Sequence, residues 1–411
     1  MNKRGIKRLF PVFMMLTFLV PASLNAHDFG LILNQTLGAT RAGGDSAADY
    51  EAALVPRVSF LLGDYGDLFL SASLKVVYEN QEWNLVPELL RNEFSWRFDN
   101  LDLNLGRMMY TDPMSLIAAG LFDGVRVSYH SSIGTFGAGL WYTGLLYRNR
   151  ANIAMTAEDA ASLGQSLDWG NFSNTYFASR RLMTAVYWDH LSFAELLHLS
   201  AAFIAQADMN GRDNAFHSQY LTAKAVMPFQ NFIFELGGAL GFAQAVNDGT
   251  DFYTALAGDI GVHWGPPAPF YNMLSFTGRF TSGASESGGS RAAFTPITAL
   301  SYGDILNAKI PGLSILSLRY TARPLHTFSA AFTISYFIRS DTETFTAYPL
   351  DGQPSNNQLL GAELFTRFIW SPVSDISLNL GAGAFLPSLG NAAPNANSRW
   401  LLEASAAMAL R

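Results

Sequence analysis

The chain has 411 residues, of which 14% are charged and 13% are aromatic, and it contains no cysteine. Soluble proteins carry about 25% charged residues, so this composition argues against an ordinary soluble domain. Beyond the first 26 residues there is no run of about 18 consecutive apolar residues, which excludes a helical membrane protein. The apolar residues are spread thinly along the chain. This distribution favours a transmembrane β-barrel, whose strands place every second side chain against lipid.

The first 26 residues have the pattern of a secretion signal. Four basic residues stand before a short apolar run, and small residues follow up to Ala26. Because the apolar run is too short for a transmembrane anchor, we predict a signal peptide over residues 1–26 and one barrel domain over residues 27–411. Its removal leaves 22 basic and 33 acidic residues, a net charge of −11, which argues against a nucleic-acid partner.

The rest of the chain alternates apolar and polar residues with period two, as strands with one lipid-facing side do. One clear run places Phe328, Phe332 and Ile334 on a single face. The same test along the chain predicts an all-β antiparallel barrel of about eighteen strands, with sixteen as the alternative count. The predicted strands span residues 29–37, 50–63, 67–78, 86–98, 101–110, 121–130, 133–147, 178–189, 196–206, 216–228, 231–244, 252–264, 271–281, 313–322, 326–339, 359–370, 375–386 and 399–411.

The connections between these strands fall into two classes. Those after even-numbered strands are tight, such as 99–100 and 229–230, whereas those after odd-numbered strands are mostly longer, with 148–177, 282–312 and 340–358 the longest. Outer-membrane barrels have short periplasmic turns and long extracellular loops. The alternation therefore predicts an outer-membrane protein of a Gram-negative-type envelope with both termini in the periplasm.

Aromatic residues and the last strand support this topology. Six even-numbered strands carry an aromatic residue on the apolar parity near the predicted periplasmic interface, where a girdle is expected. These residues are Phe98, Tyr129, Trp188, Trp264, Tyr320 and Trp370. The last strand alternates from Trp400 to Leu410 and resembles the terminal strand by which outer-membrane barrels are recognised for assembly. We therefore expect outer-membrane lipid and the barrel-assembly machinery as partners.

The parity opposite the apolar one must line the lumen, because an arginine at the bilayer midplane costs about 2–4 kcal/mol. By this parity the lumen carries eleven basic and six acidic residues. The basic ones are Arg57, Lys75, Arg91, Arg97, Arg126, Arg181, Lys224, Arg279, Arg319, Arg339 and Arg367, and the acidic ones are Glu51, Glu93, Glu235, Asp259, Glu363 and Glu403. A basic lumen attracts anions. The sequence thus predicts a channel for passive diffusion of small or oligomeric anionic solutes, oligosaccharides included.

Within this set we predict a substrate track. It consists of Arg97, Arg126, Arg279, Arg319, Arg339 and Arg367, with Lys75, Lys224, Glu93 and Glu363 beside them. The alternative role for any one residue is a structural cross-brace, as the four-residue spacing of Glu93 and Arg97 or of Glu363 and Arg367 would allow. Such pairing would still leave five basic residues without an acidic partner.

Two long loops bear on whether the lumen is open. The loop 282–312 is apolar over residues 294–310, so it folds into the lumen as a constriction or extends the strands above the membrane. The loop 148–177 places Thr156 before two acidic residues, which predicts a short helix in a lid or in an exposed loop. A surface adhesin or structural barrel with a plugged lumen is the alternative function.

Chemistry-bearing patterns are missing from the sequence. The seven histidines are scattered, with no HExxH motif and no companion serine in a recognisable turn. We therefore expect no enzymatic activity, no cofactor and no metal site.

One hairpin carries a family resemblance. Leu105 to Met108, followed by Gly120 to Val127, resembles the porin-type hairpin of the alginate-export family, in which Gly-Arg ends one strand and Phe-Asp-Gly-Val-Arg opens the next. The resemblance implies eighteen strands and a basic lumen for an anionic polysaccharide. On the strand parity Arg126 faces the lumen, whereas Arg107 and Asp123 fall on the lipid side.

Overall fold

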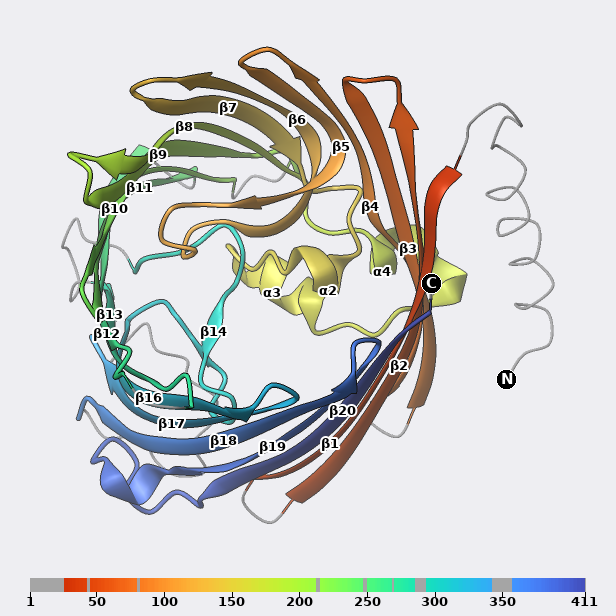
Figure 1. The fold of residues 1–411 in the computed structure, drawn as a ribbon. Coiled ribbons are helices and arrows are strands. Elements are labelled where there is room, and N and C mark those ends of the chain that lie inside the picture. The colour runs from red at the N-terminus through yellow and green to blue at the C-terminus, as the bar shows by residue number, and fades with distance from the viewer. Residues whose placement is uncertain are drawn as a thin grey trace.

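The structure is a computed structural model that describes residues 26–42, 45–79, 82–211, 215–246, 250–267, 270–284, 293–341 and 357–410. Eighteen strands form one antiparallel sheet, and β1 pairs with both β2 and β20, which closes the barrel (Figure 1). The predicted fold class and the count of eighteen are confirmed. The predicted signal peptide lies outside the described residues except for Ala26.

The strands follow the predicted ranges closely. The barrel strands are β1 (Ala26–Ala42), β2 (Asp45–Leu62), β3 (Gly66–Glu79), β4 (Glu82–Phe98), β5 (Leu101–Thr111), β6 (Ala119–Ser131), β7 (Gly134–Tyr142), β8 (Arg181–Phe193), β9 (Leu197–Asp208), β10 (Phe216–Phe229), β11 (Phe232–Val246), β12 (Thr250–Trp264), β13 (Met273–Thr281), β16 (Leu313–Leu325), β17 (Phe328–Arg339), β18 (Leu359–Val373), β19 (Ile376–Leu386) and β20 (Arg399–Leu410). The largest differences are at β1 and β2, which extend about five residues further toward their connecting loop than predicted, and at β7, which ends at Tyr142 and not at residue 147.

The loops add short elements to the barrel. These are the helices α2 (Arg148–Ala151), α3 (Ala157–Leu163) and α4 (Phe172–Tyr176), the 3-10 turns η1 (Trp169–Asn171) and η2 (Pro387–Leu389), and the paired strands β14 (Ser301–Tyr302) and β15 (Ala308–Lys309). The helix α3 begins where the sequence predicted one, because the Thr156 hydroxyl accepts the N–H of Asp159 in a capping box. Among the helices of the described residues, none is long and apolar enough to cross a membrane.

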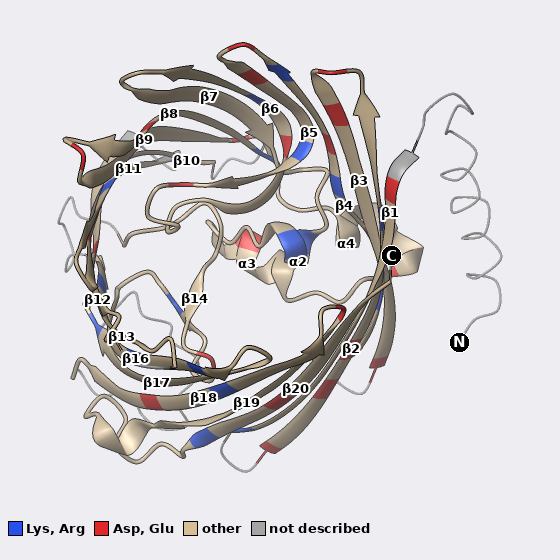
Figure 2. Ribbon diagram, in the orientation of Figure 1, with Lys and Arg blue, Asp and Glu red and all other residues tan. Residues whose placement is uncertain are grey.

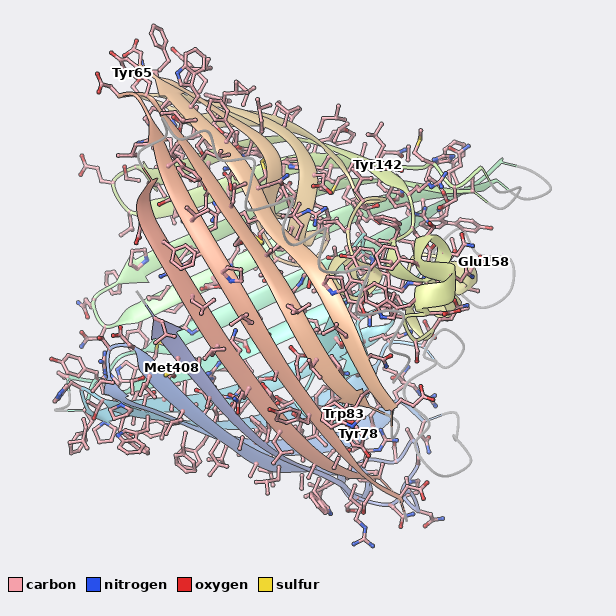
Figure 3. The ribbon with its side chains drawn as sticks, turned by 90° about the vertical axis from the view of Figure 1, so that its right-hand side faces the viewer. Tyr65, Tyr78, Trp83, Tyr142, Glu158 and Met408 are labelled. Atoms are coloured by element: carbon pink, nitrogen blue, oxygen red, sulfur yellow. The ribbon has the colours of Figure 1, made fainter. Side chains whose placement is uncertain are left out.

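The tight turns and the long loops lie at opposite ends of the barrel. In the side view, Tyr65 of the turn 63–65 and Met408 of β20 lie at one end, and Glu158 of α3 lies at the other (Figure 3). The outer wall is apolar, with exposed side chains such as Phe332 and Leu380 along its strands. Of the six predicted girdle aromatics, five are exposed at the turn end of their strands, namely Phe98, Tyr129, Trp264, Tyr320 and Trp370.

Three loops enter the barrel. Figure 1 shows β14, α2 and α3 within the ring of strands, and the hairpin between β5 and β6 bends the same way. The segment 293–312 is tied to that hairpin, because Ile297 donates its N–H to the carbonyl of Ile117 at 2.8 Å. The described segment 293–312 therefore folds into the lumen, and of the two alternatives that the sequence left open it takes the inward one.

An apolar core holds these loops against one side of the barrel. Met114, Ile117, Phe294 and Ile297 are fully buried, and they belong to one cluster with Ile204 of β9 and with residues of β10, β11 and β12. Burying a large aliphatic or aromatic side chain contributes about 1.5–3 kcal/mol. The polar part of the lumen is thus displaced toward the walls formed by β1–β4 and β16–β20.

Candidate functional site

A cavity of about 540 Å³ opens on the inner wall of β12, β13, β16, β17 and β18, and we call it the wall cavity. Its roof includes Asp304, from the inward segment 293–312. The remaining polar lining comes from the inward parity of the strands and consists of His263, Ser275, Thr277, Ser317, Arg319, Thr321, Thr333 and Arg367. Hydroxyl groups and guanidinium groups therefore converge on one cavity.

The two arginines of the wall cavity differ in their partners. Arg367 lies 2.9 Å from the Asp304 carboxylate, and its guanidinium carbon lies 5.3 Å from the centroid of the Phe365 ring, within the range of a cation–π contact. Arg319 is exposed and forms no ion pair with any described residue. A guanidinium presents a planar fork of donors that matches a carboxylate. The wall cavity can therefore bind an anion.

A second cavity, of about 400 Å³, lies between the β2–β4 wall and the inward loops, and we call it the lid cavity. Its charges are balanced, because Lys75 contacts Glu51 at 3.2 Å and Arg150 of α2 contacts Glu88 of β4 at 2.7 Å. The hydrogen bond to Glu88 raises the pKa of Arg150 above its ordinary value. Figure 2 shows the basic α2 and the acidic α3 side by side inside the ring.

Other predicted track residues are held by neighbours on the wall. Glu93 accepts hydrogen bonds from Arg91 at 2.6 Å and Asn104 at 2.8 Å, and Arg126 donates to the same Asn104 at 3.2 Å. Arg97 contacts Asp102 at 3.0 Å, where β4 and β5 meet the tight turn. These contacts form a polar network on the inner wall and near its turn end.

The remaining predicted residues support the inward segment or the loop end. Lys224 contacts Glu235 at 2.7 Å, and Arg279 contacts Asp259 at 3.1 Å and lies over the Tyr302 ring. The buried Arg339 donates to the carbonyl of Asn357 at 2.8 Å. The buried Glu363 accepts the backbone N–H groups of residues 304–306.

The pairing differs from the predicted cross-braces. Glu93 is paired with Arg91 and not with Arg97, and Glu363 binds backbone and not Arg367. The prediction of five unmatched bases was too high, because acids outside the predicted inward set take part. Seven of the eleven predicted inward bases form ion pairs with acids among the described residues, and four of these acids are Asp102, Asp159, Asp208 and Asp304.

The ion pair between Arg107 and Asp123 was not recognised from the sequence. The residues lie opposite each other on β5 and β6, with Arg107 Nε and Nη2 bonded to the carboxylate at 2.9 and 2.8 Å. Gly106, at φ +102°, lies where the hairpin bends inward, and Arg107 also donates to the carbonyl of Leu145 at 3.1 Å. The pair is therefore covered by the loop after β7 and does not face lipid. The sequence did offer one signal for this pair, because Arg107 and Asp123 have opposite charges and lie on adjacent predicted strands.

No protein-family model and no curated protein sequence matches this chain. Three solved structures from Pseudomonas aeruginosa are similar to it. OccK5 (OpdH) has a TM-score of 0.60 and 11% sequence identity, and the match covers 94% of this chain and 99% of that chain. The outer membrane protein opdK has a TM-score of 0.58 and 12% identity, with 94% of this chain and 99% of that chain covered, and OccK2 (OpdF) in complex with glucuronate has a TM-score of 0.57 and 12% identity, with 93% of this chain and 96% of that chain covered.

The barrel has a porin-like outer-membrane fold. This agrees with the predicted outer-membrane location and with the apolar outer wall. The resemblance to the alginate-export family finds no match among family models and stays a prediction. The absence of enzymatic activity likewise stays a prediction.

Proposed function

We propose that the protein is an outer-membrane channel for passive diffusion of small anionic solutes, carboxylates above all. The observation that carries this proposal is Arg319, which is exposed in the wall cavity and has no ion pair among the described residues. Arg367 lines the same cavity two strands away. A negative solute in the lumen therefore meets one free cation and a second that is accessible.

The chemistry of the cavity wall suits a hydroxylated carboxylate. Guanidinium groups bind carboxylates through short charge-assisted hydrogen bonds, and the hydroxyls of Ser275, Ser317 and Thr333 can bond the remaining oxygens of a sugar acid. OccK2 (OpdF), which has a similar fold, was solved in complex with glucuronate. That complex supports a sugar carboxylate as the first solute to test.

The dimensions of the two cavities favour small solutes over a polysaccharide. Volumes of about 540 and 400 Å³ are in the range that encloses a drug-sized ligand. The segment 293–312 and the loop 143–180 both occupy the lumen. An anionic polysaccharide, which the alginate-export resemblance implies, would require these loops to move, whereas a monosaccharide or short oligosaccharide would not.

Conductance of the purified protein in a planar bilayer tests the proposal. We expect an open channel whose reversal potential in a salt gradient shows anion preference, and whose chloride current is reduced by glucuronate. The double variant Arg319→Gln/Arg367→Gln should lose the effect of glucuronate. A channel that prefers cations would contradict the proposal.

The apolar core of the lumen favours a second candidate function. Met114, Ile117, Phe294 and Ile297 pack together as a plug would, and a barrel closed in this way would act through its long loops as an adhesin or structural protein. The same experiment decides between the two, because a plugged barrel folds and inserts but conducts no current.

A further inference from the structure

We infer that Asp304 is a built-in competitor of the transported anion. Its carboxylate binds Arg367, the same guanidinium that a solute anion would bind, and it therefore sets how tightly the wall cavity holds an anion and how readily it releases one. The inference rests on the proposed function and adds a specificity-determining residue to it.

Asp304 is presented to Arg367 by a fixed piece of backbone. The Glu363 carboxylate accepts the N–H of Asp304 at 2.7 Å, that of Ile305 at 3.0 Å and that of Leu306 at 2.8 Å. Leu306 is buried in a cluster on the inner wall that includes Phe337. Three hydrogen bonds and one buried side chain therefore hold the segment in place whether or not Asp304 contacts Arg367.

Gly303 allows this close approach. Its φ of +87° is a conformation that residues with a side chain rarely adopt, and a Cβ there would lie 2.8 Å from Glu363 Oε2 and 2.8 Å from Phe337 Cζ. On the preceding side, Tyr302 lies under the guanidinium of Arg279, 5.1 Å from its carbon. The segment is thus fixed on both sides of Asp304, and the Asp304 side chain is left to face the cavity.

The ion pair between Asp304 and Arg367 differs from the braces of the barrel in its exposure. Its side chains are 38% and 41% exposed, whereas Arg181 and Asp159 are 0% exposed. An exposed pair contributes little to stability and exchanges partners easily. Because the fold of the segment does not depend on it, the pair is free to open when another anion arrives.

The Asp304–Arg367 pair lines the same cavity as Arg319, so a solute can exchange partners in a defined order. A solute carboxylate can first bind the unpaired Arg319 and then take Arg367 from Asp304, which moves into water with its charge intact. Conduction requires that a solute bind well enough to enter and weakly enough to leave. Asp304 supplies the second requirement, because it re-forms its bond to Arg367 and repels the departing anion.

The variant Asp304→Asn tests this directly, since asparagine keeps the shape and the backbone N–H that Glu363 binds. Single-channel recordings with glucuronate at about 0.1 M salt, where charges act over about 10 Å, should show an apparent affinity about fivefold higher than in the parent, with longer blocked times. In the Arg367→Gln background, Asp304→Asn should change the affinity no further.

A matched control separates this local effect from a general change in lumen charge. Glu51 is also a partly exposed lumen acid paired with a base, but it lines the lid cavity. Glu51→Gln should leave the glucuronate affinity within twofold of the parent, and Asp304→Asn should leave the passage of a neutral sugar unchanged. An equal gain in both variants, or a gain for the neutral sugar, would overturn the role of Asp304.

The outcomes also distinguish this inference from the proposed function. A parent channel that is closed or prefers cations would contradict the proposed function itself. A parent channel that prefers anions and loses glucuronate binding on removal of Arg319 and Arg367, but whose affinity does not change in Asp304→Asn, would contradict the inference alone.

Discussion

Arg181 and Asp159 form an ion pair of 2.5 Å in which neither side chain is exposed to solvent. Arg181 begins β8, and Asp159 lies in α3 of the loop that enters the barrel, so the pair ties this loop to the wall. Arg181 also contacts Asp208 at the end of β9, at 2.9 Å. One guanidinium therefore joins two strands and the inward loop.

Removal of Asp159 should loosen α3 without unfolding the barrel, while the Arg150–Glu88 pair and the apolar core still hold the rest of the loop 143–180. Breaking a buried pair costs about 3–5 kcal/mol, but Arg181 keeps Asp208, so the wall retains its brace. We expect Asp159→Ala to raise single-channel conductance and to make the loop sensitive to protease, while the heat-resistant migration of the folded barrel persists. Ala161→Ser, on an exposed position of α3, is the control and should behave as the parent. Unchanged protease resistance in Asp159→Ala would show that the loop is held elsewhere.

The orientation of the barrel can be measured with single cysteines, because the chain has none of its own. Ala161→Cys places a thiol on α3 at the loop end, and Asn100→Cys places one in the tight turn between β4 and β5. An impermeant maleimide added to intact cells should label the first and not the second, and both should react after lysis. Labelling of residue 100 in sealed cells would reverse the predicted topology.

The carboxylate of Asp112 organises the hairpin between β5 and β6. It accepts the N–H groups of residues 114, 116, 117 and 118, and burial raises its pKa above the ordinary value. A raised pKa means that the ionised carboxylate disfavours the folded state and that the protonated form favours it. The contribution of Asp112 to stability is therefore fully present below its unfolded-state pKa and is lost as the pH rises through its folded-state pKa. Acidification through this range should therefore not destabilise the barrel on account of Asp112.

The same reasoning separates two substitutions at this position. Asp112→Asn removes the unfavourable charge and keeps one acceptor oxygen, so we expect a change in unfolding free energy of about 1 kcal/mol or less. Asp112→Ala leaves four buried N–H groups without that acceptor and should cost about 2–4 kcal/mol. Urea unfolding of both variants, followed by tryptophan fluorescence, provides the comparison. Equal losses in the two variants would mean that the negative charge itself is needed.

The sequence predicted the strands of the barrel wall and the faces of their side chains, but it did not predict the contacts of the loops inside the lumen. Lipid on one side and water on the other impose period two on each strand, so Leu318 and Arg319 could be assigned to opposite faces without any knowledge of their neighbours. The contacts of the inward loops have no such period. Glu363 binds a segment almost sixty residues earlier in the chain, and nothing in its own surroundings predicts that partner. The inward direction of Arg319 and Arg367 was therefore predictable, whereas the pairing of Arg367 with Asp304 was not.

Ion selectivity provides the most direct test of the wall cavity. Replacing Arg319 and Arg367 together by glutamate changes the charge there from +2 to −2, while Asp304 stays in place. Because low-dielectric walls concentrate the field in a narrow lumen, the anion preference should shrink or invert. The effect should fade at about 1 M salt, where the Debye length is about 3 Å. The control makes the same change of charge at Arg41 and Arg323, which are exposed near the two ends of the barrel, and should alter the reversal potential much less. Equal shifts in the two double variants would mean that the overall charge of the protein sets selectivity and that the wall cavity does not.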